Sequence, residues 1–291
     1  MWAWALGSRG DPEWVFRAQN GLASNSHWSL LMFRSLNVAA TGMAAEETQL
    51  DTIANNLANA NTAGYKSQTA QFEDLLYQNA RIAGPNAAGA VAPTETQIGS
   101  GVRVVATTRS FSQGTMQQTG NPLDLAIQGD GFFTVMRPTG EMAYTRAGSF
   151  QLDAQRRVTT SDGLPVEPPI SIPANATNIT IAADGTVSAQ QPGTSTSTSI
   201  GQIQLTTFAN PNGLRSDGHN LFSATSSSGE PTTGAPAVDG RGSLLQGSTE
   251  GSNVDVVDQM VSMIRTQRAY EINSKVISAA DEMLRNATQN Q

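Results

Sequence analysis

The sequence predicts an α+β fold in which long N- and C-terminal helices pair as a coiled coil and flank central antiparallel β structure. Apolar residues recur every seven positions near both ends of the chain, which is a helical period. Between them, short stretches alternate apolar and polar residues and are separated by Asp-Gly pairs, as in β-hairpins. Because apolar seams at both ends are buried by bundling, and small residues beside them allow close packing, we expect a self-assembling subunit.

The composition excludes several functional classes. Only 14% of the 291 residues are charged and the net charge is −7, without a basic cluster, so nucleic acid is not an expected partner. The chain has no cysteine, which excludes a disulfide framework and thiolate chemistry. No apolar run approaches the roughly 20 residues that a membrane-spanning helix needs.

The first 31 residues differ in composition from everything that follows. They contain all four tryptophans, and the Asp-Pro-Glu run at 11–13 interrupts any apolar core that a secretory signal would need. We interpret residues 1–31 as an extension that is disordered or results from a mis-set start, with Met32 as the natural beginning.

Residues 32–64 are predicted to form the N-terminal helix of an inner-tube domain. One stripe of this helix carries apolar residues at heptad spacing, beside many alanines that favour helix and permit close approach. The predicted seam consists of Leu36, Met43, Leu50, Ile53 and Leu57. The helix should end in the run ANNLANANTAGYK, where Gly64 can adopt a left-handed cap.

Residues 65–106 are predicted to be a linker or extended segment. The stretch 65–77 is ambiguous between strand and helix, whereas 80–101 is rich in Ala, Gly and Pro and has the composition of a loop. A structureless stretch of about 20 residues inside a compact domain is usually functional or disordered.

Residues 107–235 are predicted to form an outer β domain, and 236–252 a return linker. The turn-forming dipeptides are Asp130-Gly131, Asp162-Gly163, Asp184-Gly185, Asn212-Gly213, Asp217-Gly218 and Asp239-Gly240. Such pairs supply the positive φ of tight hairpins, so we expect antiparallel sheets joined by hairpins.

Residues 253–291 are predicted to form the C-terminal helix, with Asn253 as its N-cap. The seam on this helix consists of Val256, Met263, Tyr270, Ile277 and Leu284. A second stripe consists of Val254, Val257, Val261, Ile264, Ile272, Val276 and Met283. We expect one stripe to meet the N-terminal helix and the other a neighbouring subunit; a single wide core-facing stripe is the alternative.

The sequence offers no residues for catalysis, cofactor binding or metal binding. The two histidines are His27, in the first 31 residues, and His219, in the turn-like run SDGHNLF without an evident triad. The Asp-Gly pairs lack the spacing of a calcium loop, and no phosphate-binding glycine motif is present. We therefore predict a protein that is not an enzyme.

Three segments resemble the flagellar axial proteins of the rod and hook class. They are ANNLANANTAGYK, the run NPLDLAIQGDGFFTV followed by YTRAGSFQLD, and SNVDVVDQMVSMIRTQRAYEINSKVISAADEML. The signature residues are Asn55, Asn56, Asn59, Gly64 and Tyr65 at the front, and Gln267, Arg268, Tyr270 and Asn273 at the back. The run LLYQNARIAGPNAAGAVAPTETQIGSGV resembles the extra stretch of distal-rod subunits within this class.

The resemblance implies a structural subunit that polymerises helically into the distal rod of the bacterial flagellar basal body and transmits torque from motor to hook. It also implies partners: further copies of itself, proximal rod subunits, the hook protein, the P and L ring proteins, and the flagellar export apparatus. Export without a cleaved signal peptide, to a rod that spans the periplasm, is implied as well.

Two alternatives remain at this point. Within the same class, the chain could be a proximal rod or hook subunit. From a different class, it could be a secreted β-rich adhesin or a glycan-cleaving enzyme, although no catalytic histidine or carboxylate constellation supports the latter.

Overall fold

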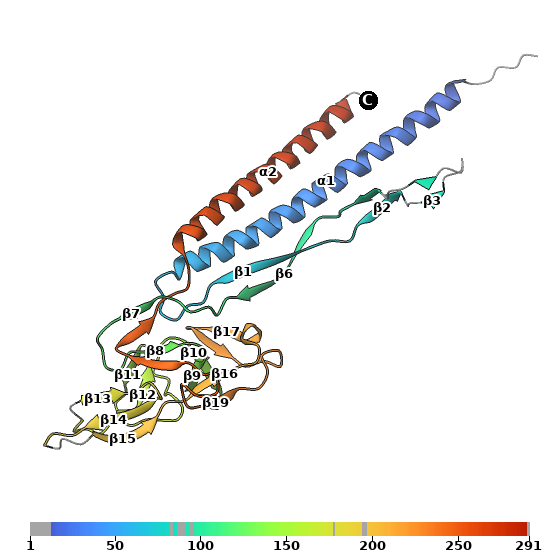
Figure 1. Cartoon of the computed structure of the whole chain (residues 1–291). Helices are drawn as coiled ribbons and strands as arrows, with labels where there is room; N and C mark the ends of the chain where they lie inside the picture. Colours follow the sequence, from blue (N-terminus) through green and yellow to red (C-terminus); the bar gives the residue numbers. More distant parts are fainter. Residues whose placement is uncertain are drawn as a thin grey trace, which may run out of the picture. The chain divides into compact units, whose positions relative to one another are not determined.

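A computed structural model describes residues 13–81, 84–85, 91–92, 96–176, 178–193 and 197–289 (Figure 1). Side chains are described from Phe33 onward, apart from residues 79–96, 177, 194–196, 287–288 and 290–291. The interpretation of residues 1–31 therefore falls on a stretch of which only part of the backbone is described.

Two long helices lie near the two ends of the chain, and the β structure lies between them in the sequence (Figure 1). Helix α1 spans Glu13–Ala58 and helix α2 spans Val256–Gln289. Helix α1 thus begins before residue 32, where we predicted its start, and ends before Gly64. Among the described residues, neither helix combines the length and apolar character required to cross a bilayer. The predicted α+β class is confirmed.

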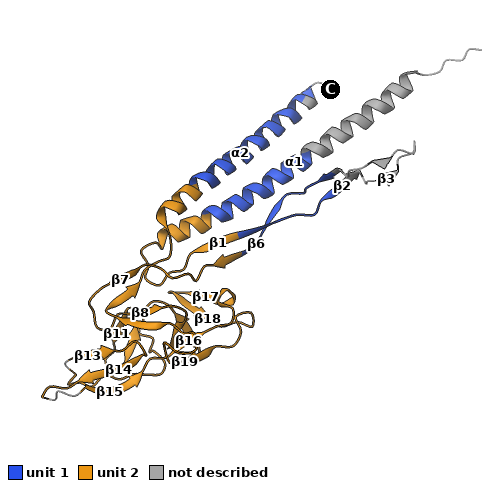
Figure 2. Ribbon diagram, in the orientation of Figure 1, with its two compact units in different colours: residues 1–50, 71–106, 264–291 blue, residues 51–70, 107–263 orange. Residues whose placement is uncertain are grey.

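The chain divides into two compact units (Figure 2). Unit 1 comprises residues 1–50, 71–106 and 264–291, and unit 2 comprises residues 51–70 and 107–263. Each unit is therefore assembled from segments that are far apart in the sequence.

Unit 1 contains most of both helices and a ladder of short strands. The strands of this region are β1 (Gln68–Asp74), β2 (Gln78–Arg81), β3 (Gly84–Pro85), β4 (Val91–Ala92), β5 (Thr96–Ile98) and β6 (Val102–Arg109). Strand β1 pairs with β6, β2 with β5 and β3 with β4. The segment 80–101, which we predicted to be a loop, therefore contains the end of β2 and strands β3, β4 and β5, whereas residues 99–101 are not in a strand.

Unit 2 contains the β domain, and the strand pairs described in it are antiparallel, as predicted. Its strands are β7 (Met116–Gln118), β8 (Leu125–Gln128), β9 (Phe132–Met136), β10 (Met142–Thr145), β11 (Phe150–Leu152), β12 (Val158–Thr160), β13 (Asn178–Ile181), β14 (Thr186–Gln190), β15 (Ser197–Gln202), β16 (Leu205–Thr207), β17 (Arg215–Gly218), β18 (Leu221–Ser223), β19 (Thr232–Gly234), β20 (Ser243–Gln246) and β21 (Ser248–Glu250). A 3-10 turn, η1, spans Pro211–Gly213.

The sheets of unit 2 differ in size. The largest has the order β17-β18-β10-β9-β16-β19, and a second has the order β13-β14-β15. The pairs β11-β12, β20-β8 and β21-β7 complete the domain. The predicted Asp184-Gly185 turn joins β13 to β14: Gly185 has a φ of 84°, and its N–H donates to the carbonyl of Ala182.

A hydrophobic core holds unit 2 together. Its largest cluster is aliphatic and includes Leu125, Ile127, Val135 and Leu205, with Phe133 packed edge-to-face against Phe150. A smaller aromatic cluster consists of Phe132, Tyr144, Phe208 and Phe222. Burial of these side chains, at about 25 cal/mol per Å², stabilises the domain.

The segment 236–252 is more ordered than the return linker that we predicted. It contains β20, which pairs with β8, and β21, which pairs with β7. The three residues of β21 are all buried. Their sequence, Ser-Thr-Glu, is polar, so a pattern of alternating hydrophobicity could not reveal this strand.

Candidate assembly site

The family-signature residues at the end of α1 meet the start of α2 inside unit 2. The side-chain amide of Asn56, 1% exposed, donates from Nδ2 to the carbonyl of Gln68 at 2.7 Å and to Oε1 of Gln259 at 3.2 Å. Its Oδ1 accepts from the N–H of Gln68 at 2.9 Å. Asn56 therefore binds the strand that follows α1 and the first turns of α2 at once.

Tyr65 and Gly64 fix the turn that follows α1. The buried Tyr65 hydroxyl lies 2.8 Å from Oδ1 of Asn55 and 3.1 Å from Oδ1 of Asn56, and burial raises the pKa of the Tyr65 hydroxyl. Gly64 has a φ of 70°, and its N–H donates to the carbonyl of Glu250. A Cβ at this position would lie 2.5 Å from the backbone N of Ala147, so both conformation and space require glycine here.

Asn59, the remaining front-signature residue, forms local hydrogen bonds at the end of α1. Its Nδ2 donates to the carbonyl of Asn55 at 2.9 Å, and its Oδ1 accepts from the hydroxyl of Thr62. The side chain of Asn59 thus adds hydrogen bonds to the last turn of α1 and to the turn that follows it.

Asn253 is not the N-cap of α2, contrary to our prediction. The cap is Asp255, whose Oδ1 accepts from the N–H groups of Val257 at 2.8 Å and Asp258 at 3.2 Å. Asn253 instead accepts from the N–H of Ser67 at 2.7 Å and donates to the carbonyl of Ser110 at 2.9 Å. It therefore ties the residues before α2 to two other segments.

The end of α1, strand β21 and the start of α2 meet in unit 2, and we refer to this region as the junction. A buried ionic cluster lies within it. The carboxylate of Glu250 accepts from Nζ of Lys66 at 2.6 Å, from Nη1 of Arg146 at 3.2 Å and from the N–H of Gly114 at 2.9 Å. The side chains of Lys66 and Glu250 are 0% exposed and that of Arg146 is 3% exposed. The second donor bond of Lys66 goes to the carbonyl of Ser112 at 2.7 Å.

The electrostatics of the cluster follow from burial. Desolvation lowers the pKa of Lys66, while its hydrogen bond to Glu250 acts in the opposite direction. Burial likewise lowers the pKa of Arg146, against the attraction of Glu250 and Asp130. One carboxylate therefore holds two desolvated cations, and this arrangement is sensitive to the loss of the carboxylate.

Lys66, Arg146 and Glu250 were not among the residues predicted from the sequence. The only local signal was the position of Lys66 directly after the signature Tyr65, at the end of the run ANNLANANTAGYK. Glu250 lies 184 positions from Lys66 along the chain, so only the fold brings them together.

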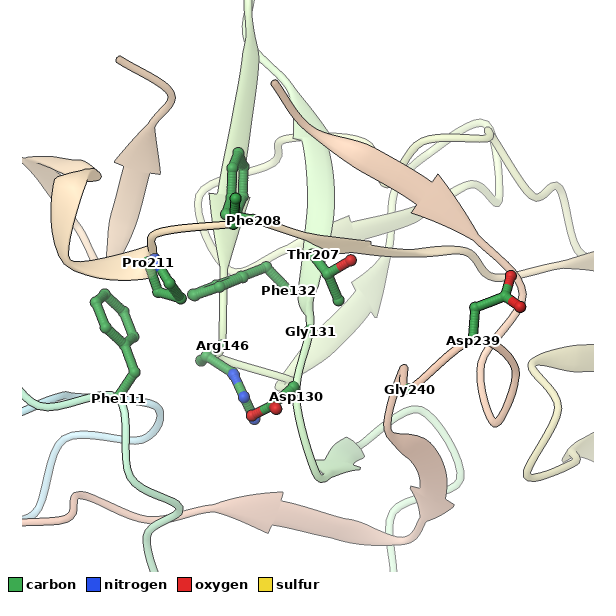
Figure 3. Close-up of a pocket in the computed structure, with 11 residues that line it drawn as sticks. Phe111, Asp130, Gly131, Phe132, Arg146, Thr207, Phe208, Pro211, Asp239 and Gly240 are labelled. Carbon is green, nitrogen blue, oxygen red and sulfur yellow. The ribbon is translucent and has the colours of Figure 1, made fainter. Parts of the chain in front are cut away.

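A pocket of about 350 Å³ lies beside Arg146 in unit 2 (Figure 3). Phe111 and Phe132 form one wall, and the carboxylate of Asp130 lies near the guanidinium of Arg146 in the view. The second carboxylate, Asp239, is paired with Arg241 at 3.0 Å. The pocket thus combines a packed aromatic wall with charged side chains that have counter-charges nearby.

The predicted seam residues differ in burial. Ile53 is 2% exposed, whereas Val256 is 38% and Tyr270 41% exposed. The half-buried members are Leu36, Met43, Leu50, Leu57, Met263, Ile277 and Leu284. The most buried apolar positions of the described helices in unit 1 are the small residues Ala39, Ala45 and Ala280.

The back signature lies on α2 within unit 1. Gln267 and Arg268 are exposed, and Arg268 is 3.4 Å from Glu271. Asn273 is half-buried beside α1: a Cβ on Gly42 would lie 3.0 Å from its Nδ2. The structure thus brings Asn273 to α1, while the other back-signature side chains face outward.

Helix α2 exposes large apolar side chains along its length. They are Val257, Met260, Val261, Ile264, Ile272, Val276 and Met283, each at least 41% exposed. Most belong to the second stripe identified from the sequence. We refer to these seven residues as the α2 stripe.

The described residues offer little for catalysis or metal binding. Within the parts that the structure describes, no three His, Asp or Glu side chains are grouped as a metal site requires. His219 lies in a turn with a φ of 52°, its side chain is 73% exposed, and its Nδ1 is 3.4 Å from a carboxylate oxygen of Asp162.

Three family models match this chain. Residues 36–66 match the model described as flagella basal body rod protein. Residues 126–189 match the flagellar hook protein FlgE/F/G D1 domain, and residues 245–290 match the flagellar basal body rod FlgEFG protein C-terminal model. The first and third matches cover the residues of the junction on both helices.

Curated relatives are similar over most of the chain. The flagellar basal-body rod protein FlgG of Caulobacter vibrioides is 48% identical over 258 residues, which are 88% of this chain and 98% of the relative. FlgG of Buchnera aphidicola subsp. Acyrthosiphon pisum is 46% identical over 89% of this chain and 100% of the relative. FlgG of Bacillus subtilis is 40% identical over 87% of this chain and 97% of the relative.

Proposed function

Because the chain belongs to the FlgG family of flagellar basal-body rod proteins, we propose that it polymerises helically through its paired terminal helices and transmits torque through the distal rod. The chain is a structural subunit of the basal-body rod and not an enzyme. The family assignment also disfavours the adhesin and glycan-cleaving alternatives, since the similarity covers both helices and the β domain.

The α2 stripe is the observation that carries the polymerisation proposal. Seven large apolar side chains on one helix are exposed in the isolated chain. A soluble monomer rarely exposes so extended an apolar surface unless it binds a partner. Burial of each such side chain contributes up to about 1.5–3 kcal/mol, so contacts between copies have a large driving force.

Two contacts support pairing of α1 with α2 in one antiparallel register. In unit 1, Gly42 closely approaches Asn273, and in unit 2, Asn56 bonds Gln259. Asn56 lies as many residues after Gly42 as Gln259 lies before Asn273, so the two contacts fit a single antiparallel register. In this register the predicted seam residues of α1 come close to facing those of α2. We propose that their half-buried side chains become fully buried when copies assemble.

The partners are part of the proposal. Rod continuity requires contacts with proximal rod subunits at one end and with the hook protein at the other, and rotation requires a surface that faces the P and L rings. Export through the flagellar apparatus to the periplasm-spanning rod, without a cleaved signal peptide, belongs to the same proposal.

Aspartate substitutions at Leu50 and Ile277 test the role of the helices. Both side chains are half-buried in unit 1, and a charge there prevents dry packing of the helices. We expect the Leu50→Asp, Ile277→Asp variant to lose rod and hook assembly, seen by electron microscopy of basal bodies, while thermal unfolding of unit 2 is unchanged.

A matched control introduces the same charges at exposed positions of the same helices. Asn37→Asp with Ser274→Asp should assemble normally, because both side chains are polar and exposed and belong neither to the predicted seam nor to the α2 stripe. Hook-bearing basal bodies from the Leu50→Asp, Ile277→Asp variant would contradict the proposed role of the seam.

A further inference from the structure

Unit 1 contains an open groove between its two helices and the turn that follows β5. The groove has a volume of about 420 Å³. Val38 and Ala39 of α1, Val276 of α2 and Ile98 give it apolar walls. Val38 is 36% and Val276 43% exposed, so the described part of the chain leaves these walls accessible.

Arg34 adds a charged group to this groove. Its Nη1 donates to Oε1 of Gln78 at 3.3 Å. Its Nη2 is buried and has no hydrogen-bond partner among the described residues. Because an unsatisfied buried donor is costly, an occupant that places an acceptor oxygen beside Nη2 is favoured.

The same unit also presents an apolar side chain that is held outward. Leu76 is 88% exposed, the highest value among the large apolar side chains that the structure describes. Its backbone is fixed, since its carbonyl accepts from the hydroxyl of Ser100 at 2.7 Å and the N–H of Leu75 donates to the carbonyl of Gly101 at 2.9 Å. The exposed Asp74 lies two residues earlier, with the half-buried Leu75 between them.

We propose that Leu76 of one copy inserts into the Arg34–Val38–Val276 groove of a neighbouring copy, and that the guanidinium of Arg34 turns to donate from Nη2 to the Asp74 carboxylate of the inserted segment. Leu76 is 88% exposed and so does not fill the groove of its own chain, and the proposed polymerisation places a second copy of the same segment beside it. The apolar fit and the opposite charges match this pairing. The inference rests on the proposed polymerisation and names one of its contacts.

The geometry of such a contact suits a rod. The groove and the Leu76 segment are different surfaces, so the contact is heterologous and each copy can both donate and receive. A heterologous contact repeats from copy to copy and produces an open helical filament when the rotation does not close a ring.

Cysteine cross-linking tests the contact, because the chain contains no cysteine of its own. The variant carries Val38→Cys and Leu76→Cys, and assembled rods in isolated basal bodies are treated with a mild thiol oxidant. Disulfides require Cβ atoms about 3.5–4.5 Å apart, so only direct neighbours react efficiently. We expect a ladder of dimers and higher multimers on a non-reducing gel, and none from either single variant.

A control pair moves one cysteine to another exposed apolar position of the same unit. Val105 on β6 is 53% exposed, and Val38→Cys with Val105→Cys should give at most about a tenth of the ladder. Rods that form normally from the Val38→Cys, Leu76→Cys variant but give no ladder overturn the inference and leave the proposed function intact. Absence of the wild-type chain from isolated basal bodies would instead overturn the proposed function.

If the Val38→Cys, Leu76→Cys variant does not assemble into rods, a charge exchange between Arg34 and Asp74 tests the contact instead. Arg34→Glu should reduce the number of hook-bearing cells at least about tenfold, because it places two carboxylates against each other. Adding Asp74→Arg to the same chain should restore most of the loss. Restoration supports the contact, and failure to restore assembly overturns it.

Discussion

Replacing Glu250 with glutamine removes the single anion that holds two buried cations. The isosteric amide keeps the volume, but Lys66, at 0% exposure, then loses its counter-charge, and Arg146, at 3% exposure, keeps only the attraction of Asp130. Breaking a buried ion pair by removing one partner typically costs about 3–5 kcal/mol. For a domain of this size, about 2–4 °C per kcal/mol gives a decrease of about 6–20 °C in the melting temperature of unit 2.

Lys66→Met is the matched comparison because it removes one of the two cations. The carboxylate of Glu250 keeps Arg146 and the N–H of Gly114, and the methionine fills most of the volume. Because Glu250 keeps a counter-charge and no buried charge is left unpaired, we expect a loss of at most about 2 kcal/mol.

Scanning calorimetry of the full-length variants measures both effects under the same conditions. The reasoning requires the Glu250→Gln variant to melt well below the Lys66→Met variant. If the two melt together, or if Lys66→Met melts first, the charge argument is refuted and packing alone governs the junction.

Two further substitutions test local features of unit 2. At Gly64 the φ is positive, and a Cβ would lie 2.5 Å from the backbone of Ala147, so we expect Gly64→Ala to lose more than about 2 kcal/mol of unfolding free energy in urea. Gly163 is the control, because its φ is 79° and a Cβ there would have no atom within 4 Å, so Gly163→Ala should lose only about 1 kcal/mol. Equal losses would contradict the steric argument. Hydrogen bonds from Ser223, Arg137 and Arg215 lower the pKa of Asp217 from 3.8 to about 2. Because the pKa of Asp217 is lower in the folded state than in the unfolded state, its ionised carboxylate stabilises the fold above about pH 4, and this contribution is lost as the pH falls toward 2. After solvent screening the contribution amounts to about 1–2 kcal/mol. The unfolding free energy of the wild type should therefore fall by that much more than that of Asp217→Asn over this interval, and parallel curves would exclude the effect.

The long elements could be predicted from the sequence because their signals are periodic and extended. Helix α1 has 46 residues and α2 has 34, so several heptads were available to define each stripe. The Asp184-Gly185 turn was predictable for a local reason, since positive φ favours these residue types. The burial of the individual seam residues was not predictable, because heptad spacing shows that a stripe is apolar but not which of its side chains are covered: Ile53 is 2% exposed and Tyr270 41%.

The junction could not be predicted because its contacts join distant segments. The three residues of β21 are polar yet completely enclosed, and Glu250 among them reads as a surface residue in any local pattern. Asn253 carries the correct residue type for a helix cap but is engaged by Ser67 and Ser110. In both cases tertiary hydrogen bonds outweigh local propensity.

The ion pair between Lys66 and Glu250 makes the integrity of unit 2 depend on residues near both ends of the polypeptide. A chain that stops before Glu250 retains Lys66 and Arg146 without the carboxylate that compensates them, and it also lacks β21 and α2. Such a fragment cannot close its junction and is exposed to proteolysis. The chain must therefore extend at least through Glu250 before unit 2 can close around Lys66 and Arg146.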